Sequence, residues 1–99
     1  MIQMIVHYEI KQNLLEPYKE VLSKISAMLP VFEADMFSCS QSEQLNHFVE
    51  TFYLPTEAHY HALKKLRLSR SHPVFGSLED FVPGGLEKIG FAAIKQEHY

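Results

Sequence analysis

The stretch that decides the fold is residues 2–10, IQMIVHYEI, at the start of the sequence. Its side chains alternate between two sides, and one side is wholly apolar: Ile2, Met4, Val6, Tyr8 and Ile10. The other side is mixed: Gln3, Ile5, His7 and Glu9. A period of two in a run rich in β-branched and aromatic residues predicts a β-strand. The first element is therefore a strand with one strongly apolar face.

The apolar period then changes to that of a helix. One stripe recurs at spacings of three and four: Leu14, Tyr18, Val21, Leu22, Ile25, Met28 and Leu29. Asn13 and Glu16 have the spacing of a capping box, and Pro17 is tolerated because it falls in the first turn. Pro30 marks the end of the pattern. The sequence predicts a helix over about residues 14–29.

The rest of the chain is predicted to contain three more strands and one more helix. We predict strands at 34–40 and 48–54 joined by a polar connection at 41–47, a helix after Thr56, a helical turn at 74–82 and a strand at 88–95. In the second helix His59, Ala62, Leu63, Leu66 and Arg70 lie along one side. That helix should end before His72, because Pro73 disfavours helical geometry in the preceding residue.

The order β-α-β-β-α-β is that of the ferredoxin-like α+β sandwich. The chain of 99 residues has the length of one domain, which we assign to residues 1–99. Two helices cover only one face of a four-stranded sheet, yet the first and last strands are apolar on both faces. We therefore expect a homodimer in which a second copy covers the other face.

Composition narrows the class of protein. A net charge of −3 argues against a broad basic surface for nucleic acid. The single cysteine, Cys39, cannot form an intrachain disulfide and fits a reducing compartment. The N-terminal stretch has no basic leader, and no run approaches the roughly 20 apolar residues that span a bilayer. We expect a cytoplasmic protein with no membrane and no nucleic-acid partner.

In these features the chain resembles the dimeric α/β-barrel superfamily and, within it, the antibiotic-biosynthesis-monooxygenase-like (ABM-like) domains. The resemblance covers about residues 2–96. It rests on the order and length of the elements, on the strand FVETFY at 48–53 and on the His-containing helix at 56–70. It rests also on the Ser71-His72-Pro73 break and on the closing strand of small and aromatic residues.

The resemblance implies a homodimer whose two sheets form a barrel, with a pocket between sheet and helices in each subunit. Members include cofactor-independent monooxygenases of aromatic polyketides, haem-degrading enzymes and isomerases. The haem-degrading branch uses an Asn on its first strand and a Trp; this chain has His7 there and no Trp. We therefore expect no cofactor. The leading hypothesis is a monooxygenase-like enzyme on an aromatic or conjugated ligand; the alternative is a non-catalytic dimeric binding or stress-associated domain.

Two carboxylates and one histidine on the strands are candidate catalytic groups. His7 and Glu9 point the same way, so an imidazole and a carboxylate could act together in proton transfer; the alternative is a polar patch at a strand end. Glu50 lies between Phe48 and Phe52, where burial suits a general acid. Glu50 could equally pair with a Lys or Arg as a structural ion pair.

The other candidates are histidines near the second helix and one tyrosine. His61 loosely matches a helix His of the family and His72 precedes Pro73; both are candidate catalytic residues, and both could be structural. Tyr53 is expected to line the pocket. His59 and His61 diverge by about 200° on a helix, so they do not make a metal pair, and we expect no metal site.

Three further features of the sequence give weaker indications of a functional site. The basic stretch Lys64, Lys65, Arg67 and Arg70 suits a solvated face near a helix C-terminus, or a docking patch for an anionic substrate. Cys39 is more typical of a small buried residue than of a nucleophile. Finally, the family's pocket favours an arrangement in which His7 and Glu9 face the helices, with the Ile2–Ile10 side between subunits. The alternative has the apolar side under the helices and His7 in the dimer interface, where it would be structural; both burials are energetically reasonable.

Overall fold

The structure is a computed structural model that describes residues 1–96. Its strands are β1 (Ile2–Glu9), β2 (Asp35–Gln41), β3 (His47–Leu54) and β4 (Gly90–Lys95), and its α-helices are α1 (Leu15–Met28) and α2 (Glu57–Arg67). Short 3-10 helices are η1 (Gln12–Leu14), η2 (Leu29–Phe32), η3 (Phe75–Asp80) and η4 (Leu86–Lys88). The predicted order β-α-β-β-α-β is confirmed.

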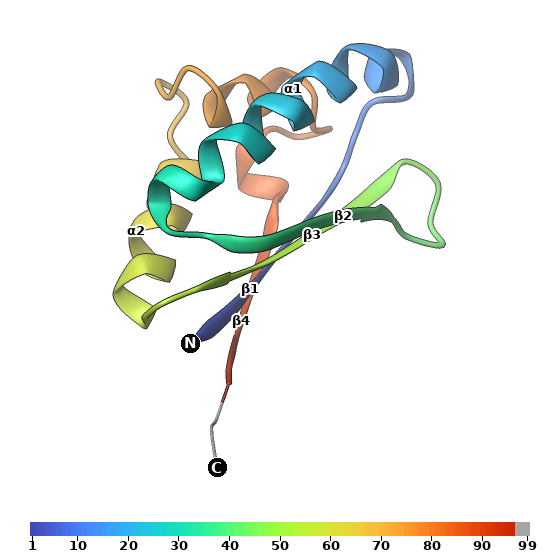
Figure 1. The fold of residues 1–99 in the computed structure, drawn as a ribbon. Helices are drawn as coiled ribbons and strands as arrows, with labels where there is room; N and C mark the ends of the chain where they lie inside the picture. The colour runs from blue at the N-terminus through green and yellow to red at the C-terminus, as the bar shows by residue number, and fades with distance from the viewer. Residues whose placement is uncertain (97–99) are drawn as a thin grey trace.

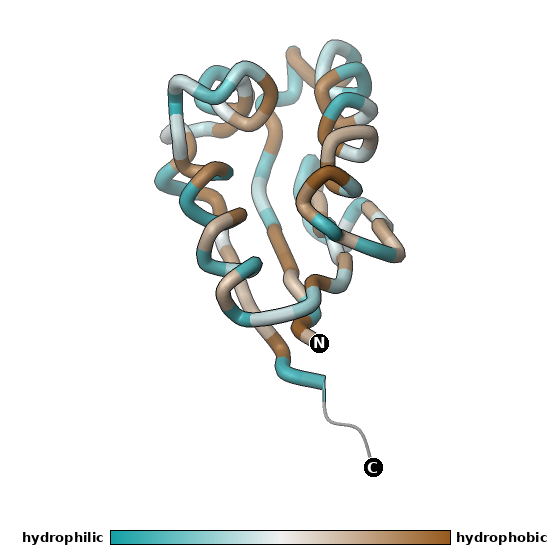
Figure 2. Tube along the Cα trace, turned by 60° about the vertical axis from the view of Figure 1, so that its left-hand side comes forward, coloured by the Kyte–Doolittle hydropathy of each residue, from teal (hydrophilic) through white to brown (hydrophobic). Residues whose placement is uncertain are grey.

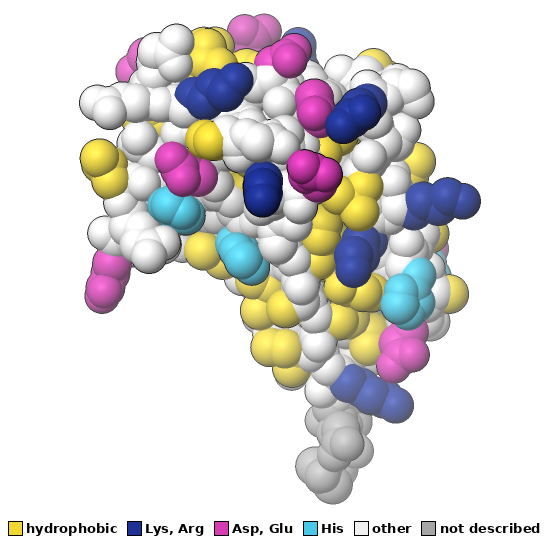
Figure 3. Space-filling view, turned by 180° about the vertical axis from the view of Figure 1, so that it is seen from behind, with side chains coloured by type: hydrophobic (Ala, Val, Ile, Leu, Met, Phe, Trp, Pro, Cys, Tyr) yellow, Lys and Arg dark blue, Asp and Glu magenta, His cyan; other side chains and the backbone are white. Residues whose placement is uncertain are grey.

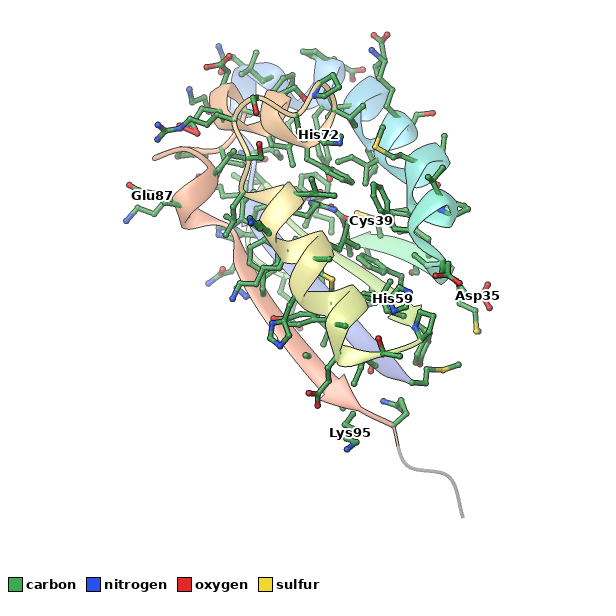
Figure 4. The ribbon with its side chains drawn as sticks, turned by 90° about the vertical axis from the view of Figure 1, so that its left-hand side faces the viewer. Asp35, Cys39, His59, His72, Glu87 and Lys95 are labelled. Atoms are coloured by element: carbon green, nitrogen blue, oxygen red, sulfur yellow. The ribbon has the colours of Figure 1, made fainter. Side chains whose placement is uncertain are left out.

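The four strands form one antiparallel sheet in the order β2-β3-β1-β4 (Figure 1). β1 is central, and Val6 is paired with Glu50 of β3 on one side and with Phe91 of β4 on the other. Both α-helices lie on the same side of this sheet (Figure 4). The fold is therefore a two-layer ferredoxin-like α+β sandwich, as the sequence predicts.

The core lies between the two layers. It takes the apolar side of β1 together with residues from β3, both helices, η2 and η3. Among the most deeply buried are Met4, Val6, Ile10, Ile25, Leu29, Phe52, Leu63, Phe75 and Leu78. Apolar and polar residues alternate along both helices, as amphipathic packing requires (Figure 2). Among residues 1–96, no helix combines the length and apolar character needed to cross a membrane.

The helix ends differ in detail from the predictions. Asn13 is part of η1, and α1 begins after Leu14 without a side-chain cap, so the predicted capping box does not form. At α2 the predicted cap is present: the Thr56 Oγ1 accepts a hydrogen bond of 3.3 Å from the backbone N–H of His59. α2 ends at Arg67, before His72, as expected.

The assignment of the two faces of β1 is wrong. Met4 and Val6 have no exposed surface and lie under the helices, whereas His7 and Glu9 are exposed on the opposite face. The helices cover the more apolar face because burying it removes the larger apolar area from water. We call the uncovered side, which His7 and Glu9 share, the open face.

Candidate functional site

A fully buried ion pair joins the sheet to the second helix. Glu50 on β3 and Arg67 on α2 have no exposed side-chain surface. Two hydrogen bonds of 2.8 Å run from Arg67 Nη1 to Glu50 Oε1 and from Nη2 to Oε2. Burial lowers the pKa of Arg67, but the charge and hydrogen bonds of Glu50, together with Tyr8 and Tyr18, raise that pKa overall. The pair is therefore charged and bidentate.

Two tyrosines extend this pair toward the other helix. The Tyr8 hydroxyl of β1 donates to Glu50 Oε2 over 2.6 Å. Tyr18 of α1 lies with its hydroxyl oxygen 2.7 Å from that of Tyr8, and their rings meet edge to face. Because the Tyr8 proton is committed to Glu50, Tyr18 is the donor in the bond between the two phenols. The last member is Cys39 of β2, whose Sγ is 3.8 Å from the Tyr18 oxygen. We call Cys39, Tyr18, Tyr8, Glu50 and Arg67 the buried polar chain.

The buried polar chain holds its phenols and thiol in the neutral form. Burial raises the pKa of Tyr8 well above its usual value, and the nearby Glu50 charge raises it further. Burial likewise raises the pKa of Tyr18, although its hydrogen bond to Tyr8 opposes the change. The pKa of Cys39 is raised by burial too, with the Tyr18 bond acting against it. All three groups are hydrogen-bond donors at neutral pH rather than nucleophiles.

The outer end of the chain reaches a cleft between α1 and β2. The cleft has two adjoining parts of about 620 and 290 Å³, which share Lys19 and Leu22 of α1. Cys39 borders the larger part and Tyr18 the smaller. Figure 4 shows Cys39 between the layers, on the strand beside α1. The inner end, at Arg67, is closed: its guanidinium lies 4.9 Å over the ring centroid of Phe75.

The apolar part of this α1–β2 cleft comes from both layers. Leu15 of α1 and Phe48 of β3 line the smaller part, and Phe37 lines the larger. The Phe48 ring lies 4.7 Å from that of Tyr18, between centroids. Hydroxyl groups complete the larger part: Ser23, Ser26 and Ser38. Such a mixture of apolar walls and a few polar groups is typical of sites for small organic molecules.

The structure does not bring the predicted site residues together within one chain. Glu50 lies under the helices, whereas His7, Glu9 and Tyr53 lie on the open face, as the pairing of Gln3 with Tyr53 requires. His7 lies across Gly90 of β4, where a Cβ atom would collide with the imidazole ring. Their catalytic roles stay predictions.

The two candidate histidines near α2 occupy different places again. His61 is exposed on the helix, with its ring edge toward Tyr60. His72 stacks on Phe75, and its Nδ1 accepts hydrogen bonds from the backbone N–H groups of Val74 and Phe75. His72 and His7 are on opposite sides of the sheet, so they do not share a cavity of one subunit. Among residues 1–96, no group of three or more His, Cys, Asp or Glu side chains could hold a metal ion.

Sequence reasoning missed four members of the buried polar chain. The predicted stripe along α2 is not the buried side of the helix, whose buried residues are Tyr60, Leu63 and Arg67. Arg67 is therefore not part of the solvated basic face that the sequence predicts. The spacing of those three was the available signal, since a residue four after Leu63 lies on the same helix face. The structural ion pair considered for Glu50 is present, with Arg67 as its partner.

Solved structures of proteins described as antibiotic biosynthesis monooxygenases share this fold. A candidate enzyme of that kind from Nitrosomonas europaea matches with a TM-score of 0.73 and 18% identity, over 99% of this chain and 100% of its own. One from Deinococcus radiodurans gives 0.72 and 14%, over 100% of this chain and 95% of its own. A third structure gives 0.64 and 13%, over 99% of this chain and 100% of its own. No protein-family model and no curated protein matches the chain.

At these identities the likeness shows the fold alone. The resemblance to ABM-like domains is confirmed at that level: the four-stranded sheet with two helices on one side is the fold of those structures. The question that the fold leaves open is what the buried polar chain and the cleft at its end do.

Proposed function

We propose that this chain is a cytoplasmic, small-molecule-binding homodimer that acts as a cofactor-independent, monooxygenase-like enzyme on an aromatic or conjugated substrate. One observation carries the proposal: a buried polar chain runs from the Glu50–Arg67 pair through Tyr8 to Tyr18 and Cys39 at the α1–β2 cleft. Replacing a buried ion pair by apolar side chains is often neutral or stabilising. Stability alone therefore does not account for the buried polar chain, and its position at the end of a cleft favours a functional role.

The substrate chemistry needs a proton acceptor and no external reductant. In a fused-ring phenol such as a hydroxylated anthrone, loss of one proton from the ring methylene leaves an electron-rich anion that reacts directly with O₂. The methylene becomes a carbonyl by gaining one oxygen atom. Its two hydrogens leave with the second oxygen atom as water, so atoms and electrons balance without a cofactor. The protein has to hold the phenol, accept the proton and exclude competing water.

The direction of the hydrogen bonds suits that role. Tyr8 donates to Glu50 and Tyr18 donates to Tyr8, so a proton arriving at the Tyr18 oxygen can move inward to the carboxylate. Glu50 stays hydrogen-bonded to Arg67 while it holds the proton, which is returned as water forms. The raised pKa values of both phenols keep the chain protonated and correctly oriented between turnovers.

The open face is the proposed dimer interface. Its centre is uncharged and partly apolar: Ile5 lies between Thr51 of β3 and Ala92 of β4, and Gln3 lies between Tyr53 and the exposed Ile94. A second copy of the sheet has the same uncharged centre and buries it without introducing an unpaired charge there. His7, Glu9 and Tyr53 then belong to the interface, where His47 Nε2 already lies 3.7 Å from Glu9 Oε1.

The remaining candidates take supporting roles in this proposal. Glu50 stays in the site as the proton acceptor. His72 is proposed as a positioning residue, because it stacks on Phe75, whose ring in turn carries Arg67. His61 stays a candidate contact on the surface of α2.

The alternative function, a non-catalytic binding or stress-associated dimer, has one observation in its favour. The bidentate bonds join both carboxylate oxygens of Glu50 to both terminal nitrogens of Arg67, as in a purely structural pair. Binding of a ligand in the α1–β2 cleft without turnover is the outcome that this alternative predicts.

The experiment is oxygen incorporation from ¹⁸O₂ into a hydroxylated anthrone, with metal-free protein and no added cofactor. We expect a quinone product that carries one ¹⁸O atom, formed faster than in buffer or with heat-denatured protein. Saturable binding of the anthrone with no enzyme-dependent product would instead support the non-catalytic alternative and overturn the enzymatic proposal.

A further inference from the structure

A second cleft lies at the opposite edge of the sheet, beside β4. It has a volume of about 790 Å³ and is bounded by the C-terminal end of α2, by η4 and by the start of β4. None of its lining residues belongs to the buried polar chain or to the α1–β2 cleft. Whatever this α2–β4 cleft binds is therefore held by a different set of side chains.

The walls of the α2–β4 cleft are apolar. Leu86 and Ile89 are buried and form its inner part, together with Phe91 of β4. Leu68, directly after α2, lines the cleft and is 40% exposed, so its side chain is accessible to a ligand. Figure 3 shows this side of the molecule, where apolar side chains lie between basic and acidic ones.

Two cations border those walls. The Lys64 Nζ lies 5.5 Å from the ring centroid of Phe91, so its charge is held over the apolar surface rather than extended into solvent. Arg70 is 74% exposed and uses its Nε in a 3.3 Å ion pair with Glu79. Because the guanidinium is planar and rigid, the N–H groups on its edge away from Nε do not face Glu79.

Two acidic side chains, Glu79 and Glu87, lie near these cations. The Glu79 carboxylate accepts a 3.0 Å hydrogen bond from the backbone N–H of Leu86, and this bond and then Arg70 lower the pKa of Glu79. Glu79 thus fixes η4 against the loop after α2. Glu87 is the one carboxylate among the lining residues, facing two cations. The lining residues alone carry one net positive charge, and Glu79, outside the lining, offsets part of the charge of Arg70.

We propose that the α2–β4 cleft binds a small amphipathic carboxylate: one anionic group on an apolar body. The carboxylate pairs with Lys64 and the free side of the Arg70 guanidinium, and the Ser71 hydroxyl is within the same lining. The apolar body lies against Leu68, Leu86 and Phe91. Glu87 weakens the binding by repulsion and selects against dianions.

The test uses 2-naphthoate as the probe and the neutral 2-naphthamide as its matched control, on the full chain. Binding is followed by ¹H–¹⁵N NMR, with shifts expected at Leu68, Leu86 and Phe91 and not at Tyr18 or Cys39. We expect the naphthoate to bind about tenfold more tightly than the amide, because the charge is the recognised feature. Equal affinities, or shifts that map to the α1–β2 cleft, would overturn the proposal.

Variants separate specific pairing from general charge. Lys64→Met keeps the aliphatic packing on Phe91 but removes the cation, and should weaken naphthoate binding about tenfold. Lys65→Met removes the same charge from an exposed position outside the cleft, and should leave binding within about twofold. Glu87→Gln should strengthen binding by about twofold to fivefold. Identical effects of the two lysine variants, or weaker binding by Glu87→Gln, would contradict the assignment.

Discussion

The Arg67 guanidinium and the Glu50 carboxylate meet along two parallel hydrogen bonds of 2.8 Å, and solvent reaches neither side chain. Each charge compensates the other, and for this reason both groups can be buried. Removing one partner leaves a charge in the core with no compensation, and that cost is far larger than the net value of the pair.

Arg67→Met is expected to lower the free energy of unfolding by about 3–5 kcal/mol, since Glu50 stays buried without its partner. Urea denaturation followed by circular dichroism measures the loss. The control is the double variant Arg67→Met with Glu50→Leu, which removes both charges and should recover most of the stability. A single variant as stable as the parent would show that Glu50 is hydrated and the pair is not closed.

Alkaline pH should destabilise the fold through Tyr8 and Tyr18. Both phenols have a pKa raised above the unfolded value of about 10, so the stability they contribute is complete below pH 10 and is lost as pH rises further. Tyrosinate absorbance at 295 nm should show two phenols that ionise only as the chain unfolds. The Tyr8→Phe/Tyr18→Phe variant should lack this late step; its persistence would assign it to other tyrosines.

The sequence predicts the layers well because the pattern of each element is local. The alternation at 2–10 and the stripe from Leu14 to Leu29 each depend on neighbours within one element, and both elements are present. The family resemblance predicts the wrong face of β1, because it places the polar side of the strand under the helices. Ile2, Met4, Val6, Tyr8 and Ile10 form the more apolar side, and this side lies under the helices.

The candidate site was harder to predict because it depends on the phase of five separate elements: β1, α1, β2, β3 and α2. Arg67 meets Glu50 across 17 positions of sequence, and Tyr8 meets Tyr18 only after α1 folds back over the sheet. No local spacing encodes those pairings. The sequence indicates Glu50 as a candidate because it is a charged residue within an apolar strand. It does not indicate Tyr8 and Tyr18, because they resemble ordinary core residues.

The two faces of β1 can be separated by substitution at neighbouring positions. Ile5→Asp puts a charge on the open face and should give a folded monomer of 11.5 kDa in place of a dimer of about twice that mass. Val6→Asp puts the charge under the helices, beside the buried Glu50 carboxylate with which Val6 is paired, and should unfold the chain. Light scattering and circular dichroism measure both. A folded Val6→Asp protein, or an unchanged assembly state for Ile5→Asp, would contradict the arrangement.

Gly90 and His7 should be energetically coupled. A Cβ atom at Gly90 would strike the His7 imidazole, so Gly90→Ala should cost about 1 kcal/mol of stability as the ring is displaced. In a His7→Ala background the same change should be neutral or slightly stabilising, because alanine orders a strand better than glycine. Thermal unfolding of the four proteins gives the coupling. Equal costs in both backgrounds would mean that the ring does not lie across the glycine.

The measurement that tests the central claim most directly compares turnover with stability in Tyr18→Phe. This variant removes one hydroxyl at the cleft end of the buried polar chain and leaves the ring packed on Phe48. Tyr60→Phe is the matched control, a buried tyrosine outside that chain. We predict that Tyr18→Phe lowers the rate of ¹⁸O incorporation at least about tenfold, with a melting temperature within a few degrees of the parent and of the control. Unchanged turnover by Tyr18→Phe in a folded protein would place the chemistry elsewhere and contradict the account.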